Sequence, residues 1–207
     1  MLAREGAPFI IVPIVLAVVL GLLVHWLVGV LLIAVALFMV YFFRDPERRP
    51  PDETGVIVSA ADGTVTRVEE SDAGKLVSVF LSPLDVHINR SPISGRVTKV
   101  EYTQGKKLPA TSDRSSFLNE RNSLTIAGQG FSVVCTQIAG ILARRIVCRA
   151  KQGDRLSIGE RFGLIKFSSR TDVLMPPDVE LTVKPGDKVT GGVTIIGRTT
   201  AKTDKQE

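Results

Sequence analysis

His87 is the only histidine outside the apolar N-terminal run, which makes it the side chain best suited to proton transfer at neutral pH. A free imidazole has a pKa of about 6.5, so it takes up and releases protons close to pH 7. In the stretch LSPLDVHINRSP, Asp85 comes two residues before His87 and Arg90 three residues after it. Residues two apart in a strand point to the same face, so we expect the Asp85 carboxylate to orient the imidazole.

Asp62 and several arginines are further candidates for chemistry. Asp62 lies in SAADGTV, where Asp-Gly is also a common hairpin turn. The segments NERN and ARRIVC, residues 119–122 and 143–148, contain guanidinium groups that can bind a phosphate through paired hydrogen bonds. A solvated charged face explains the same arginines equally well. These guanidinium groups belong to Arg121, Arg144 and Arg145.

Two serines, Ser168 and Ser169, stand together in RFGLIKFSSRTDV, between a run with strand character and an Arg-Thr-Asp turn. Serine pairs are common in loops, so the pair by itself indicates no chemistry. Cys135 and Cys148 are isolated in apolar surroundings without the spacing of a metal site, so we expect reduced core cysteines and no bound metal. The net charge of +5 is modest, and we expect no nucleic-acid partner.

The elements that must position these residues begin with an apolar segment. From Ala7 to Phe43 the chain contains no Asp, Glu, Lys or Arg. As one helix this run would be about 55 Å long, against about 30 Å for the hydrocarbon core of a bilayer. The run divides naturally at His25-Trp26. We therefore predict a transmembrane helical hairpin as a membrane anchor over residues 1–44.

The charges that flank the apolar run predict its orientation. Arg4 precedes it and Arg44, Arg48 and Arg49 follow it, so both ends carry the positive charge typical of the cytoplasmic side. The same groups attract anionic lipid headgroups. A single tilted span would instead put the two ends on opposite sides. A cleaved signal peptide is disfavoured, because the run is too long and no small-residue cleavage site follows it.

In the remainder of the chain, the apolar residues follow a different periodicity. A proline-rich linker, residues 45–54, prevents the helix from continuing. From residue 55 to 207, short β-branched runs such as KLVSVFLSP and GRVTKVEYTQG alternate with Gly, Asp-Gly and Pro-Gly turns. We predict a mainly β fold, with a compact antiparallel sandwich or barrel-like domain over residues 55–207.

Several motifs, taken in order, resemble one known family. DVHINRSPISGRV, NERN, ARRIVC, GDRLSIGERFGLIKFSSRTDVLMP and VKPGDKVTGGVTIIG, behind an apolar hairpin, resemble the short form of the phosphatidylserine decarboxylase proenzyme family. The resemblance runs from the membrane segment to about Thr199. It implies a lyase at the cytoplasmic side of the cell membrane that converts phosphatidylserine to phosphatidylethanolamine and carbon dioxide in phospholipid biosynthesis. Oligomeric state is left open.

The resemblance also assigns roles to residues. Family members cut themselves before a serine that becomes a covalent pyruvoyl group, an electron sink comparable to pyridoxal. By position this serine is Ser169, which implies a cut between residues 168 and 169 into a large and a small chain. Asp62 matches the aspartate of the family's Asp-His-Ser arrangement, and His87 is the implied base and proton donor. The implied substrate ligands are Arg90, Asn119, Arg121, Arg144 and Arg145.

This sequence departs from the family pattern at three positions. Long-form relatives have two histidines, H-x-x-H, where this chain has His87 followed by Arg90, so one imidazole must serve cutting, turnover or both. Whether Asp62 or Asp85 orients it stays open. Ser168 stands where the family typically has glycine, which permits a strained turn, although some unrelated pyruvoyl enzymes are cut between two serines. Phe117 stands where relatives often carry a polar or acidic residue.

Two other functions fit parts of the sequence. VKPGDKVTGGVTIIG together with an N-terminal anchor also suggests a non-enzymatic, membrane-anchored adaptor with a lipoyl-like β-sandwich. Such a protein would remain one intact chain and would need no His-plus-Ser arrangement. The same chemistry on an archaeal-type serine lipid with ether chains is the second alternative, because the headgroup is identical.

The hairpin predicts that both ends of the chain face the cytoplasm. A reporter that is active only in the cytoplasm, fused at Glu5 or after Glu207, should therefore be active in both fusions. A reporter that is active only outside the cytoplasm is the control, and it should be silent in both. Opposite sidedness of the two fusions would contradict the hairpin.

Overall fold

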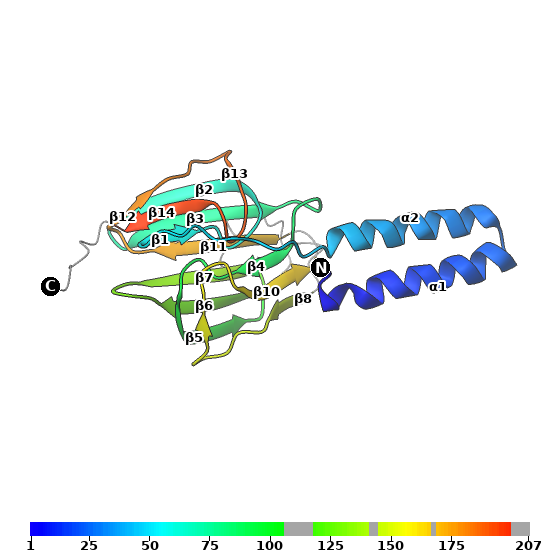
Figure 1. Cartoon of the computed structure of the whole chain (residues 1–207), viewed down its shortest axis with the longest axis horizontal. Helices are drawn as coiled ribbons and strands as arrows, with labels where there is room; N and C mark the ends of the chain where they lie inside the picture. Colours follow the sequence, from blue (N-terminus) through cyan, green and yellow to red (C-terminus); the bar gives the residue numbers. More distant parts are fainter. Residues whose placement is uncertain (106–117, 141–144, 167–168, 200–207) are drawn as a thin grey trace. The chain divides into compact units, whose positions relative to one another are not determined.

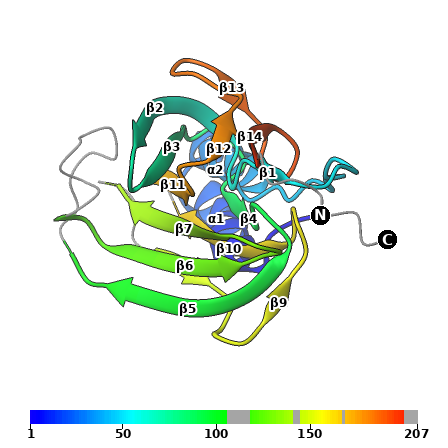
Figure 2. The ribbon, with the colours of Figure 1, turned by 90° about the vertical axis from the view of Figure 1, so that its left-hand side faces the viewer.

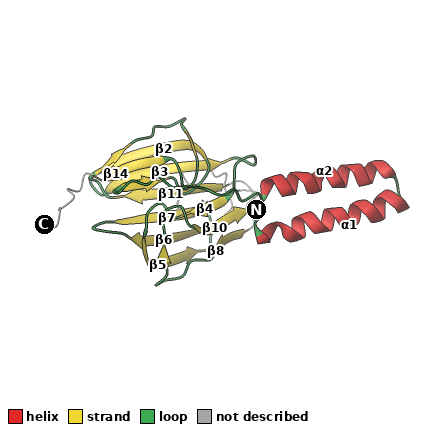
Figure 3. Ribbon diagram, in the orientation of Figure 1, coloured by secondary structure: helices red, strands yellow, loops and turns green. Residues whose placement is uncertain are grey.

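The computed structural model describes residues 1–105, 118–140, 145–166 and 169–199 of the 207-residue chain. Two compact units make up the chain, Met1–Glu47 and Arg48–Glu207. The first is helical and the second consists of β-strands and loops (Figure 3).

The helical unit contains a short 3-10 helix, η1 (Arg4–Gly6), followed by α1 (Ala7–Leu23) and α2 (Trp26–Phe42), which lie side by side (Figure 1). His25 ends the turn between them, and its Nδ1 atom accepts a hydrogen bond of 3.2 Å from the amide of Leu27. This bond caps the first turn of α2, where backbone amides have no partner within the helix. The apolar run is thus divided at His25 in the structure.

Small residues allow the two helices to approach closely. A Cβ atom on Gly21 would lie 3.2 Å from the Cα atom of Gly29, and Ala17 and Ala36 are buried. Close packing of small residues is a common way for apolar helices to associate in lipid. Among the described segments, Arg4–Leu23 is long and apolar enough to cross a membrane, whereas Trp26–Phe42 is shorter, with 17 residues.

The β unit contains three antiparallel sheets. The largest curls like half a barrel, with the strand order β13-β2-β3-β11-β7-β6-β5-β9 (Figure 2). Two three-stranded sheets have the orders β1-β14-β12 and β4-β10-β8. The strands are β1 (Val56–Val58), β2 (Gly63–Ser71), β3 (Gly74–Leu81), β4 (Ile88–Arg90), β5 (Gly95–Thr103), β6 (Arg121–Ala127), β7 (Ser132–Ala139), β8 (Arg145–Cys148), β9 (Arg155–Leu156), β10 (Arg161–Lys166), β11 (Ser169–Met175), β12 (Val179–Leu181), β13 (Lys188–Val189) and β14 (Ile195–Thr199).

Alternation along the strands builds a large hydrophobic core. In β6, buried and partly buried residues alternate along the whole strand, as expected when one face of a sheet is covered. The core includes Val79 of β3, Leu124 of β6, Cys135 of β7 and Val173 of β11, all at most 1% exposed. The predicted mainly β, antiparallel fold is confirmed, and Cys135 and Cys148 are free thiols.

Candidate active site

Ser169 is the first residue of β11, a strand that is hydrogen bonded on both sides. Its Cα partners are Leu81 of β3 and Ala139 of β7. The residue is fully buried, and its hydroxyl has no hydrogen-bond partner within the described residues. Because an unsatisfied buried polar group costs free energy, such a group in a native fold calls for an explanation such as a chemical role. Ser168 lies outside the described residues.

The prediction of a strand through Asp85 and His87 is wrong. Strand β3 ends at Leu81 and β4 begins at Ile88, so residues 82–87 form a turn. The Asp85 carboxylate bends back within this turn and accepts hydrogen bonds from the amide of Ser82 at 2.8 Å and from its hydroxyl at 2.7 Å. The two-residue period of a strand therefore does not apply to Asp85 and His87.

The backbone of Asp85, not its carboxylate, contacts the imidazole of His87. Its carbonyl oxygen lies 2.9 Å from Nδ1 of the buried ring. A carbonyl oxygen can only accept, so Nδ1 must carry the hydrogen. In the neutral ring, Nε2 then carries the lone pair, which is the form that can act as a base.

Two features bring the surroundings of His87 and Ser169 together. The turn that contains His87 leaves β3 at Leu81, the Cα partner of Ser169. Farther along, the amide of Asn89 donates a hydrogen bond of 2.9 Å to the hydroxyl of Thr171. Asn89 and Thr171 each follow a candidate residue by two positions, so this hydrogen bond joins the two backbone segments close to both candidates.

Asp62 lies between β1 and β2, partly buried. Its Oδ2 atom forms an ion pair with Arg48 at 2.8 Å, and its Oδ1 atom accepts a hydrogen bond of 2.8 Å from the amide of Gly191. Burial raises the pKa of the Asp62 carboxyl above its ordinary value of 3.8, while Gly191, Arg48 and Arg90 act in the opposite direction. The buried Arg90 donates to the carbonyl of Gly159 at 3.0 Å. Asp62 and Arg90 thus belong to one charged cluster.

The other predicted ligands separate into two groups. Asn119 is buried and donates a 2.7 Å hydrogen bond to the carbonyl of Ala139, the residue paired with Ser169. Arg145, at the exposed start of β8, is the Cα partner of Lys166 of β10.

Arg121 belongs to the other face of the large sheet. It pairs with Ile138, which in turn pairs with Arg170. Arg170 and Ser169 are neighbours in β11 and point to opposite faces. The sequence prediction grouped Arg121 with Ser169, whereas the register separates them. Arg144 lies outside the described residues.

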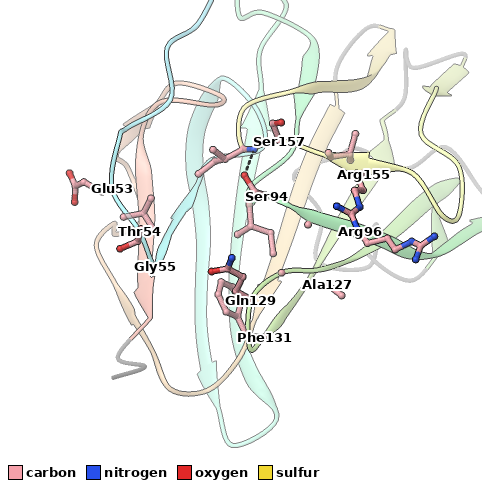
Figure 4. Close-up of a pocket in the computed structure, with 16 residues that line it drawn as sticks. Glu53, Thr54, Gly55, Ser94, Arg96, Ala127, Gln129, Phe131, Arg155 and Ser157 are labelled. Atoms are coloured by element: carbon pink, nitrogen blue, oxygen red, sulfur yellow. Dashed lines mark hydrogen bonds between the residues drawn. The ribbon is translucent and has the colours of Figure 1, made fainter. Parts of the chain in front are cut away.

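The larger of two cavities does not coincide with these residues. A cavity of about 630 Å³ is lined by side chains that include Glu53, Ser94, Arg96, Phe131 and Arg155 (Figure 4). None of the candidate residues that the structure describes lines it. A smaller cavity of about 330 Å³ includes Arg121 and Asp172. The candidate active site is therefore the group of buried polar residues around Ser169, because the side chains that could react lie there and do not line the larger cavity.

Comparison with known proteins gives the family. The family model for phosphatidylserine decarboxylase matches residues 35–197. The chain belongs to this family. It is 50% identical over 206 residues to a phosphatidylserine decarboxylase proenzyme of Symbiobacterium thermophilum, covering 96% of this chain and 95% of that protein. Proteins with the same name from Solibacter usitatus and Geotalea uraniireducens are 49% and 43% identical, covering 85% and 95% of this chain and 88% and 95% of their own lengths.

Phosphatidylserine decarboxylases are carboxy-lyases, so this member of the family is an enzyme. The adaptor alternative consequently has no support. The term proenzyme in the names of the relatives refers to a precursor, which gives the buried hydroxyl of Ser169 its context.

Sequence reasoning missed the polar residues beneath the site. Three of them, Asn89, Gln137 and Thr171, are fully buried. Asn89 is hydrogen bonded to both Gln137 and Thr171. The partners are 48 and 82 residues apart in the chain, so no local pattern could have paired them. The available signal was a polar amide at a strand position where an apolar residue is usual.

The raised pKa of Asp62 predicts a specific pH dependence of stability. Just above pH 3.8 the folded chain binds more protons at this carboxyl than the unfolded chain, so its contribution to stability grows as the pH falls through the folded-state pKa. Asp62→Asn removes this contribution. We expect the thermal unfolding midpoint of the parent to rise, relative to that of the variant, on acidification through this range. Measurements on uncut Ser169→Ala chains avoid interference from cleavage, and parallel curves would contradict the assignment.

Proposed function

We propose that this chain is a membrane-associated phosphatidylserine decarboxylase that activates itself by cutting between Ser168 and Ser169. It then converts phosphatidylserine to phosphatidylethanolamine and carbon dioxide. The observation that carries the proposal is the fully buried hydroxyl of Ser169, which has no hydrogen-bond partner among the described residues of a chain whose relatives are named proenzymes.

The cut begins with the hydroxyl of Ser169. Nε2 of His87 takes the hydroxyl proton, and Oγ attacks the carbonyl carbon of Ser168. The peptide C–N bond breaks as the nitrogen takes up a proton, which leaves an ester and a free amine. Loss of the Ser169 Cα proton then breaks the Cβ–Oγ bond and releases the Ser168 carboxylate. Water hydrolyses the remaining dehydroalanine to a pyruvoyl group and ammonia.

The residues of the site fit a pyruvoyl group at position 169. When formed, this group supplies an electron sink for the substrate amine, in the way that pyridoxal does elsewhere. The buried start of β11 holds position 169 away from water, and a dry site favours loss of a charged carboxylate from the substrate. His87 then returns a proton from Nε2 to the carbon that carbon dioxide has left.

Two cations support binding of the lipid phosphate. Arg145 and Lys166 are directly opposite in an antiparallel pair, next to the segment that leads to Ser168. Guanidinium and ammonium groups on neighbouring strands can both donate charge-assisted hydrogen bonds to one phosphate. We propose that Arg145 binds the phosphodiester. We assign Asn119 and Arg90 to holding the backbone around the site, since both donate to carbonyl groups.

The apolar helices support a location at the membrane. We propose that they anchor the enzyme in the cell membrane with the β unit in the cytoplasm, where anionic lipid and substrate are available. The groups named here would contact only the headgroup, so an ether-linked serine lipid would bind in the same way.

The serine pair gives the direct test of the proposal. Ser169→Ala lacks the attacking hydroxyl, so the chain should stay whole and inactive. Ser168 contributes only its carbonyl, so Ser168→Gly should be cut at least as fast as the natural chain. Intact mass should show a small chain of residues 169–207 whose N-terminus is blocked and reacts with hydroxylamine. A free serine N-terminus, or a natural chain that is never cut, would overturn the proposal.

The assignment of His87 as the base is tested separately. His87→Ala removes the only imidazole of the β unit, so the chain should be cut very slowly, or should be cut and then turn over poorly. Asp85→Asn is the matched control, because the Asp85 backbone carbonyl that orients the ring is unchanged. Cutting rate and carbon dioxide release are the measurements, and normal rates of both in His87→Ala would remove it from the mechanism.

A further inference from the structure

A chain of buried side-chain hydrogen bonds runs beneath the site. The amide of Asn122 donates to Oε1 of Gln137 at 3.2 Å, and Nε2 of Gln137 donates to Oδ1 of Asn89 at 2.8 Å. The Asn89 amide in turn donates to the Thr171 hydroxyl at 2.9 Å. At most 3% of each of these four residues is exposed. We name this set the amide chain.

The amide chain crosses between two sheets. Asn122, Gln137 and Thr171 lie on β6, β7 and β11 of the large sheet, whereas Asn89 lies on β4 of a separate three-stranded sheet. Each amide accepts through its oxygen and donates through its nitrogen, so the orientation of one amide determines that of the next. Asn89 is therefore held by Gln137 on one side and by Thr171 on the other.

The surrounding backbone makes room for this arrangement. Gln137 also donates to the Val147 carbonyl of β8 at 3.3 Å. Gly163, in the neighbouring strand β10, leaves space for it, because a Cβ atom at this position would lie 3.0 Å from Nε2 of Gln137. Two strands of the small sheet thus accommodate one amide of the large sheet.

We propose that the amide chain is a positioning device that aligns His87 with Ser169 for self-cleavage, an inference that rests on the proposed function. Asn89 follows His87 by two residues and Thr171 follows Ser169 by two residues. A bond between Asn89 and Thr171 therefore holds β4 and β11 together two residues from Ser169, which is in β11, and two residues from His87, which lies just before β4. Burying amides is costly unless all are hydrogen bonded, so apolar residues would fill this space more cheaply if alignment were not required.

Thr171 offers the cleanest test, because its hydroxyl can be removed without changing the size of the side chain. Thr171→Val removes the acceptor of Asn89, and Thr171→Ser restores it. Thr136→Val is the matched control: it removes a hydroxyl that is paired with Ser123 at 2.9 Å in the same sheet, outside the amide chain. Each full-length chain is made in a cell-free reaction with detergent, and the uncut precursor is followed over time at several pH values.

Misalignment should slow the cut without unfolding the chain. We expect cutting of Thr171→Val to be about 10- to 100-fold slower, and Thr171→Ser and Thr136→Val to stay within about threefold of the natural chain. Any dependence of the cutting rate on pH that the His87 base contributes should be weaker in Thr171→Val than in Thr171→Ser and Thr136→Val. The thermal unfolding midpoint of Thr171→Val, measured in a Ser169→Ala background, should fall more than that of Thr136→Val, because the buried Asn89 amide loses its acceptor, but it should stay above the temperature of the cutting reaction.

The outcomes separate this inference from the proposed function. If the natural chain is cut and Ser169→Ala is not, but Thr171→Val is cut at the natural rate, the positioning role is wrong and the proposed function stands. The positioning role is also wrong if Thr171→Ser is as slow as Thr171→Val, or if Thr136→Val is equally slow. A natural chain that folds and is never cut overturns both.

Discussion

Strand β11 is hydrogen bonded along its length to β3 on one side and β7 on the other, and this double pairing holds Ser169 in place. A shift of one residue would turn its core-facing side chains, such as Thr171 and Val173, toward the opposite face. In the proposed cut enzyme, the small chain would contain β11 to β14, of which β11, β13 and β14 pair with β3, β7, β2 and β1 of the large chain. The two chains would therefore stay together as one fold after the peptide bond is lost.

The two faces of β11 are held by different interactions. On the face of Ser169, the Thr171 hydroxyl accepts from Asn89. On the other face, Arg170 and Asp172 form an ion pair at 2.9 Å with side chains only 3% and 9% exposed. Burial raises the pKa of Asp172, which Arg170 opposes. Removing one partner of such a buried pair typically costs about 3–5 kcal/mol, so the pair stabilises the fold, whereas the Asn89–Thr171 bond connects β11 to β4.

The parts of the structure that follow local patterns could be predicted from the sequence. The apolar run divides at His25, which caps the second helix, and the alternating Val and Thr runs form antiparallel strands. One prediction failed where the chain leaves a regular element, and the position of another residue depends on pairing between distant strands. Asp85 lies in a turn, so its carboxylate does not follow the strand period, and Arg121 is on the face opposite Ser169 because of pairing between distant strands. The Asn89–Thr171 bond joins residues 82 apart, which single-sequence patterns do not connect.

One imidazole can serve both proposed steps because the steps do not overlap in time. The Asp85 carbonyl fixes the hydrogen of His87 on Nδ1, which leaves Nε2 as the basic atom throughout. During the cut, Nε2 is needed by the hydroxyl of Ser169. That hydroxyl is lost when the pyruvoyl group forms, so Nε2 then becomes available to the substrate. Arg90, where long-form relatives have a second histidine, instead donates to Gly159 and partly opposes the rise in the pKa of Asp62 that burial causes. A permanent cation there stabilises the Asp62 charge, which a neutral imidazole could not do.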